Sequence, residues 1–294
     1  MNGQPCSGMI SRQPATPLSR DTIFMLIHIG FELVFDVPAP VPMLLVLYTH
    51  PEQAHLLKRP EWVQVEPFVD VHSFIDSFGN RAAHITAPAG RLRLRYDNVI
   101  QDSGLPEPTI EGARLHPPDE IPASCMQFLL ASRYCEVDRM SQIAWDLFGK
   151  TPATWERVAA VVNWVHGNVR FGYEFARPTK TALDVWNEKQ GVCRDFMHLT
   201  ITLLRALHIP ARYATGYLGD IGVPAVPLAM DFAAYCEVYL GGRWYTLDPR
   251  HNMPRIGRIL QARGRDAVDV ALTTSFGTAR LDSFKVWTAE VGCA

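Results

Sequence analysis

The stretch MDFAAYCEVYLGGRWYTLDPRHN, residues 230–252, decides the fold of the second half of the chain. Two runs with strand composition, AAYCEVYL and RWYTLD, meet at Gly241-Gly242, which favours a tight hairpin turn. Because alternate residues of a strand share one face, the even-numbered positions of the first run form an apolar face, and we expect Cys236 to lie in the core. The second run ends at Asp248, which a proline follows. The sequence therefore predicts an antiparallel hairpin that presents an aspartate at its open end.

A cysteine stands where a helix is expected to begin. Cys193 follows Gly191, and the run CRDFMHLTITLLRALHIP has the period of an amphipathic helix that stops at Pro210. A thiol at a helix N-terminus lies at the positive end of the helix dipole, which favours the thiolate, and the backbone N–H groups there can hold an oxyanion. Two interpretations stay open from placement alone, a nucleophile and a buried structural cysteine. Asp248 is similarly open, because Asp-Pro is also a common turn.

The rest of the chain divides by composition. Residues 1–24 have little apolar periodicity and lack the apolar core of a secretory signal, so we expect a disordered extension, with a start at Met25 as the alternative. Residues 25–100 are rich in strand-forming runs, including the strictly alternating RLRLRY, which predicts a β-sandwich-like domain. Residues 101–124 are proline-rich and aperiodic, as in a linker. Residues 125–294 form the expected core domain.

The core domain is expected to contain helices first and an antiparallel sheet afterwards. VDRMSQIAWDLFGK is helical in period, and Thr151 before a proline is the expected cap of the next helix. The strand candidates are ARYATGYLG, AAYCEVYL and RWYTLD. The fold class is therefore α+β.

Bulk composition excludes several classes of function. The chain of 294 residues has a net charge of −2 and no basic stripe, so we expect no nucleic-acid partner. No run of eighteen apolar residues exists, so we expect no membrane span. The six cysteines show neither C-x-x-C pairs nor zinc-ligand spacing, which predicts no metal and a reducing cytoplasm. No glycine motif for a nucleotide is present, so no cofactor is expected, and the sequence does not specify an oligomeric state.

The segments GVCRDFMHLTITLLRALHIPARYATGYLGD and DFAAYCEVYLGGRWYTLDPR resemble the bacterial transglutaminase-like superfamily, which shares the papain-like cysteine protease fold. The resemblance covers about residues 150–270, and the β-rich region before it is similar to the N-terminal domain that often precedes this core in bacteria. By resemblance, Cys193 is the nucleophile and Asp248 the aspartate that orients a histidine. Attack on a peptide or glutamine amide then gives a thioester, and the partner is a peptide or protein substrate. Apart from the resemblance, Trp186 and Tyr235 are candidates to contact the substrate, and packing in the core is the alternative role for Trp186.

The histidine of the family pattern is missing. The strand motif begins with histidine in the family, and here that position is Ala233. Alanine cannot take the thiol proton or protonate the leaving amine, so the chain as written is expected to be inactive or severely impaired. The competing hypothesis is a non-catalytic pseudoenzyme that binds peptides in the same groove. An engineered variant of an active enzyme, and thiolate chemistry that needs no histidine, also stay open.

Three other histidines are candidates to replace the missing base. His251 lies three residues after Asp248, whereas His198 and His208 lie on the helix of Cys193. His198 leaves that helix on a different side from the thiol, and His208 is several turns away. Surface or core roles are therefore expected for all three residues, because a base must lie within hydrogen-bonding distance.

Overall fold

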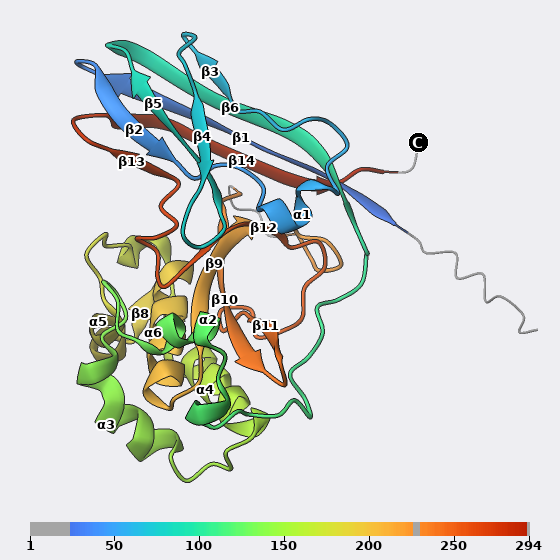
Figure 1. The fold of residues 1–294 in the computed structure, drawn as a ribbon, viewed down its shortest axis with the longest axis vertical. Helices are drawn as coiled ribbons and strands as arrows, with labels where there is room; N and C mark the ends of the chain where they lie inside the picture. The colour runs from blue at the N-terminus through green and yellow to red at the C-terminus, as the bar shows by residue number, and fades with distance from the viewer. Residues whose placement is uncertain (1–23, 226–229, 293–294) are drawn as a thin grey trace, which may run out of the picture.

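A computed structural model describes residues 24–225 and 230–292 of the chain (Figure 1). The upper part of Figure 1 is a sandwich of two antiparallel four-stranded sheets. The first sheet has the order β14 (Arg280–Glu290), β1 (Met25–Val37), β6 (Gly90–Asp102) and β3 (Gln64–Glu66). The second sheet has the order β13 (Thr273–Ser275), β2 (Val41–Leu45), β5 (Arg81–Ala87) and β4 (His72–Ile75).

Side-chain alternation explains the sandwich. In β6 the residues Leu92, Leu94 and Tyr96 are buried between the sheets, whereas the arginines between them face outward. Each fully buried side chain of this kind stabilises the fold by roughly 1.5–3 kcal/mol. The β-sandwich-like domain predicted from RLRLRY and its neighbours is therefore confirmed.

The last two strands return to this sandwich. β14 pairs with β1 from Ile27–Glu290 to Asp36–Arg280, and β13 pairs with β2. The expected core boundary at residue 294 must be corrected, because residues 273–290 complete the N-terminal sheets. The pattern of a strand is local, but its pairing partner can lie anywhere in the sequence, so the periodicity carried no sign of this pairing.

The lower part of Figure 1 holds the helices and a third antiparallel sheet. The sheet has the order β11 (Arg243–Leu247), β10 (Ala233–Leu240), β9 (Ala211–Tyr217) and β12 (Ile259–Gly264). The helices are α3 (Val137–Phe148), α4 (Trp155–Asn168), α5 (Ala182–Glu188) and α6 (Cys193–Ala206). α6 is central: its residues from Asp195 onward are buried against β9, β10 and the other three helices. The α+β class is confirmed.

Short elements complete the chain. They are α1 (Pro51–Ala54), α2 (Ala123–Met126), the two-residue parallel strands β7 (Arg170–Phe171) and β8 (Gln190–Gly191), and three 3-10 turns (Pro118–Glu120, Gln127–Leu129 and Tyr173–Phe175). The predicted cap at Thr151 is wrong. Thr154 caps α4 by accepting a hydrogen bond from the Glu156 N–H at 3.2 Å, because Pro152 and its neighbours form a turn before the helix.

The two parts of the molecule share their apolar cores. Val46 and Ala82 of the N-terminal part pack into the cluster around α6, and Tyr217 and Phe232 of the core part pack into the sandwich. Between β6 and α2, the segment predicted as a linker contains one short helical element, the 3-10 turn Pro118–Glu120. Apart from Phe24, the predicted disordered extension lies outside the described residues. Among the described helices, none is long and apolar enough to cross a membrane.

Candidate active site

Cys193 is the first residue of α6, as predicted, and it is partly buried. The start of the helix is fixed by Asp195, whose fully buried carboxylate accepts a hydrogen bond from the Val192 N–H at 3.0 Å. A Cβ atom at Gly191 would lie 2.6 Å from the Cβ of Asp195, so only glycine fits there. The Asp195 cap and Gly191 together hold the thiol at a defined place beside β10.

The electrostatics of the thiol differ from the expectation. Burial raises the pKa of the Cys193 thiol, although the backbone N–H groups of Ala234 and Arg194 act in the opposite direction. Asp231 also raises this pKa, and Arg250 lowers it. The prediction that the helix dipole would favour the thiolate is therefore wrong, because desolvation outweighs the dipole and the N–H groups. A protonated thiol needs a base before it can attack a carbonyl.

Asp248 follows the last residue of β11, at the open end of the predicted hairpin. Gly241 and Gly242 make the hairpin turn with φ values of +55° and +86°, a region that favours glycine. The pairing of Cys236 with Leu247 fixes the register, and Cys236 is fully buried, as predicted. The register places the Asp248 carboxylate in the protein interior, where 2% of its side chain is exposed.

Two side chains, an imidazole and a guanidinium, hold that carboxylate. The Oδ2 atom of Asp248 lies 2.8 Å from Nδ1 of His251 and accepts a hydrogen bond from the Arg258 guanidinium at 2.9 Å. Burial alone would raise the pKa of Asp248, but the hydrogen bond from His251 and the charge of Arg258 outweigh burial and lower this pKa. Asp248 is therefore an anion in the folded protein at any pH near neutrality.

Position 233 opens a small cavity beside the thiol. The small cavity has a volume of about 100 Å³ and is lined by Cys193, Ala233 and His251, together with Tyr173, Asp231 and Arg250 and five further residues. The structure thus brings the thiol and the position of the missing imidazole to one cavity. Asp248 does not line this cavity and reaches it through His251.

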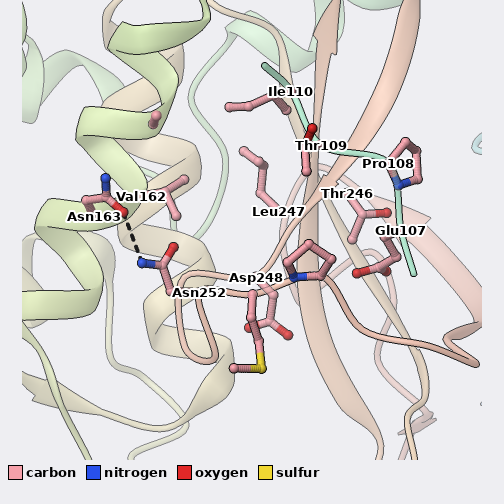
Figure 2. A pocket seen from close by; sticks show the side chains of 13 residues that line it. Glu107, Pro108, Thr109, Ile110, Val162, Asn163, Thr246, Leu247, Asp248 and Asn252 are labelled. Carbon is pink, nitrogen blue, oxygen red and sulfur yellow. Dashed lines mark hydrogen bonds between the residues drawn. The ribbon is translucent and has the colours of Figure 1, made fainter. Parts of the chain in front are cut away.

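Asp248 faces a different cavity on its other side (Figure 2). Leu247 and Asn252 line this cavity with Asp248, and Glu107 and Pro108 of the linker form another part of its wall (Figure 2). This cavity of about 190 Å³ contains neither Cys193 nor Ala233 in its wall, so it is not the place where a substrate meets the thiol.

Cys193 also lines a second and larger space, which we call the large groove. It has a volume of about 820 Å³ and extends between the core domain and the sandwich. Its walls are mainly aromatic and aliphatic and include Tyr134, Tyr173, Tyr213, Val268, Val270 and Leu272. Cys193, Tyr173, Asp231 and Phe232 line both the groove and the small cavity, so the thiol lies where the two spaces meet.

The two residues expected to contact substrate lie elsewhere. Trp186 stacks on Trp164 with ring centroids 4.9 Å apart, and the ammonium of Lys189 lies 3.4 Å from its ring centroid. Tyr235 is 3% exposed beneath the guanidinium of Arg258. Neither residue lines the small cavity or the large groove. Their surroundings are those of packing residues, and contact of either side chain with a substrate stays a prediction.

The structure also adds residues that the sequence did not single out. Tyr173 begins a 3-10 turn and Arg250 lies in the turn after β11. Neither segment has a periodicity that marks a face, so only their closeness in sequence to β7 or Asp248 could have suggested them. His198 is fully buried, accepts a hydrogen bond from the Ala267 N–H at 3.2 Å and stacks on Tyr134, which confirms a core role. His208 is exposed. Among the described residues, no group of three or more histidine, cysteine, aspartate or glutamate side chains could hold a metal ion.

Comparison with known proteins agrees with this geometry. Residues 141–249 match the family model of the transglutaminase-like superfamily. A crystal structure from Cytophaga hutchinsonii, of a protein proposed to be a cysteine protease, matches with a TM-score of 0.77 at 27% identity and covers 92% of both chains.

Two mycobacterial proteins are similar in sequence. The uncharacterised protein ML0607 of Mycobacterium leprae is 24% identical over 74% of this chain and 79% of its own length. The uncharacterised protein Rv2569c of Mycobacterium tuberculosis is 26% identical over 66% of this chain and 68% of its own length. The family match and the Cytophaga hutchinsonii fold show that residues 141–249, which contain Cys193, Ala233 and Asp248, form a transglutaminase-like domain with a papain-like core.

Proposed function

We propose that the chain is a thiol acyltransferase or hydrolase whose turnover is severely impaired. Cys193 attacks the carbonyl carbon of a peptide or glutamine-type amide, the C–N bond breaks, and the acyl group is carried as a thioester until water or an amine takes it. The observation that carries this proposal is the position of Cys193 at the junction of an open groove and the small cavity at position 233. The protease assignment proposed for the Cytophaga hutchinsonii protein supports the same reaction class.

The impairment follows from the missing base. Burial raises the pKa of the Cys193 thiol, so little thiolate exists near neutral pH. In a complete triad an imidazole removes this proton and later protonates the leaving amine, and loss of a triad member lowers turnover by about 10⁴-fold or more. Ala233 supplies neither step. Activated esters, whose leaving groups need no proton, should therefore react much faster with this chain than amides do.

The groove indicates which part of a substrate the chain accepts. Three tyrosines and several aliphatic side chains line it, so it favours an apolar or aromatic stretch of peptide on the acyl side of the scissile bond. Arg177 and Arg194 also line it, but their guanidinium groups are paired with Asp184, Glu188 and Asp195. Selection for an acidic substrate is therefore not expected from these arginines.

Covalent labelling tests the proposal directly. The chain and its Cys193→Ala variant are incubated with p-nitrophenyl acetate, and intact mass with peptide mapping locates the acetyl group. We expect acetylation at Cys193 and none at the fully buried Cys236, which serves as the internal control. The proposal is contradicted if Cys193 is not acetylated, or if another residue accounts for ester cleavage and the Cys193→Ala variant cleaves at the same rate.

A second function is a peptide-binding pseudoenzyme. The large groove is open although the base is missing, and binding needs only the groove. This function predicts that Cys193→Ala leaves the affinity for an apolar fluorescent peptide unchanged. It also predicts that Val268→Arg, at an exposed wall of the groove, lowers the affinity. A strong loss of binding on Cys193→Ala would instead indicate covalent capture.

A further inference from the structure

His251 forms the aspartate–imidazole pair that the family pattern assigns to another position. Its Nδ1 atom lies 2.8 Å from Oδ2 of Asp248, and its backbone N–H donates to Oδ1 of the same carboxylate at 3.2 Å. The turn that follows β11 closes this arrangement, because the Asn252 N–H donates to the Asp248 carbonyl at 2.7 Å. The residue is thus held at two points, its ring nitrogen and its backbone N–H, by one buried carboxylate.

The orientation of the ring leaves its second nitrogen free. In a triad the aspartate binds Nδ1, which fixes the tautomer and leaves Nε2 to accept a proton. Here Nδ1 is the nitrogen bound to Asp248, and Nε2 has no hydrogen-bond partner among the described residues. The side chain is 28% exposed, and it lines the small cavity that Cys193 also lines.

The small cavity that Cys193 and His251 both line is large enough to hold water. A cavity of about 100 Å³ holds several water molecules, because one water needs roughly 10–15 Å³ on this measure and two or more polar partners. Tyr173, Asp231 and Arg250 line the cavity with His251 and supply such partners. A water in this space can approach a thioester on Cys193, and a base can act through it.

We propose that His251, oriented by Asp248, is the general base that activates this water for hydrolysis of the Cys193 thioester. The inference rests on the proposed function and assigns its second half-reaction. A proton moves from the water to Nε2, the water oxygen bonds to the carbonyl carbon, and the C–S bond breaks. The sulfur leaves as a thiolate and takes a proton from bulk water, and the imidazolium returns its proton to that water, so the products are a carboxylic acid and the free thiol.

Under this assignment, the alanine at position 233 impairs acylation of the thiol but not hydrolysis of the thioester. Position 233 is adjacent to the backbone N–H of Ala234 that faces the sulfur, so an imidazole there would serve the first step, in which the thiol loses its proton. His251, which lines the same cavity, serves the second step. The chain should consequently be slow to acylate from amides, but it should release an acyl group once one is attached.

The charged groups around His251 define the controls. Asp220, Asp231, Arg250 and Arg255 line the same cavity, and Arg258 shares the Asp248 carboxylate with His251. Variants at these positions would change the field at the base, so they are avoided. His166 is a matched control: its Nδ1 atom lies 3.0 Å from the Pro249 carbonyl in the same turn, but the residue is exposed and lines neither the small cavity nor the large groove.

The experiment separates the two half-reactions. The full chain is acetylated with p-nitrophenyl acetate, excess ester is removed, and loss of the acetyl group from Cys193 is followed by intact mass from pH 5 to 9. We expect His251→Asn to slow the loss at least tenfold and to remove the rise of the rate with pH. The asparagine side chain keeps an N–H donor near Asp248, but it has no basic nitrogen that could take up a proton. His251→Gln is the second variant, and His166→Asn should release acetate at the parent rate.

The outcomes are distinct. If both His251 variants fold and release acetate at the parent rate with the parent pH profile, His251 is not the base, although the proposed function stands. An equal slowing in His166→Asn would assign the effect to the turn rather than to the imidazole, and would also overturn the inference. If the parent chain never acquires an acetyl group at Cys193, the proposed function fails and this inference fails with it.

Discussion

The carboxylate of Asp248 and the guanidinium of Arg258 lie 2.9 Å apart, with 2% and 4% of their side chains exposed. Arg258 also pairs with Glu107 of the linker at 2.6 Å. The same arginine therefore keeps the buried aspartate ionised and binds the linker to the core domain through an ion pair. A buried pair of this kind is costly to break, because one charge is left without compensation.

Arg258→Met should destabilise the protein by about 3–5 kcal/mol, since it leaves Asp248 and Glu107 without their shared cation. Arg280→Met is the matched control, because Arg280 pairs with Asp36 at 3.2 Å on the surface. The control should change stability by no more than about 1 kcal/mol. Urea unfolding measures both free energies, and equal losses in the two variants would contradict the role assigned to Arg258.

Acid should weaken the fold through His50, which is 3% exposed at the junction of the two parts. Burial, followed by the charge of Arg263, lowers the pKa of His50 to about 4. The unfolded chain takes up this proton near pH 6.5 and the folded chain near pH 4, so stability is complete above pH 6.5 and is lost as pH falls toward 4. The contribution is of order 3 kcal/mol.

Urea unfolding at pH 7.5 and 4.5 tests this linkage. His50→Gln should reduce the loss between the two pH values, whereas His72→Gln, at an exposed position on β4, should leave the loss as in the parent. Burial also lowers the pKa of His198, which is fully buried. The His50 variant should therefore still lose some stability between the two pH values. An unchanged loss in His50→Gln would contradict the assignment.

The reactivity of Cys193 should report its desolvation. Burial raises the pKa of this thiol above the ordinary value, so the rate of alkylation by iodoacetamide should reach its midpoint above about pH 9. Arg250→Gln should move the midpoint higher, because Arg250 lowers the pKa of Cys193. Peptide mapping assigns the reaction to Cys193 among the six cysteines. A midpoint below pH 7 would show that the helix dipole outweighs burial.

The local parts of the site could be predicted from the sequence, and the non-local parts could not. The Gly241-Gly242 hairpin, the burial of Cys236 and the helix that begins at Cys193 follow from periodicity and turn residues alone. The pairing of β14 with β1 joins residues some 250 positions apart, and no local pattern encodes it. The raised pKa of Cys193 depends on the atoms packed around the helix start, which a dipole argument omits.

His251 lies between these two cases. Its spacing of three residues from Asp248 is visible in the sequence, and such a spacing fits a turn in which the side chain returns to the carboxylate. No pattern in the sequence favours this return over a surface position. The hydrogen bond at Nδ1 and the shared cavity with Cys193 supply that reason.

Restoring the imidazole at position 233 tests the central claim, that this site is a thiol active site lacking one proton carrier. The turnover of a peptide p-nitroanilide by Ala233→His should exceed that of the parent by about 10²–10⁴-fold, the usual contribution of a general acid–base group. The double variant Ala233→His with Cys193→Ala should show no gain. A revertant that is no faster than the parent, or a gain that persists without the thiol, would contradict the account.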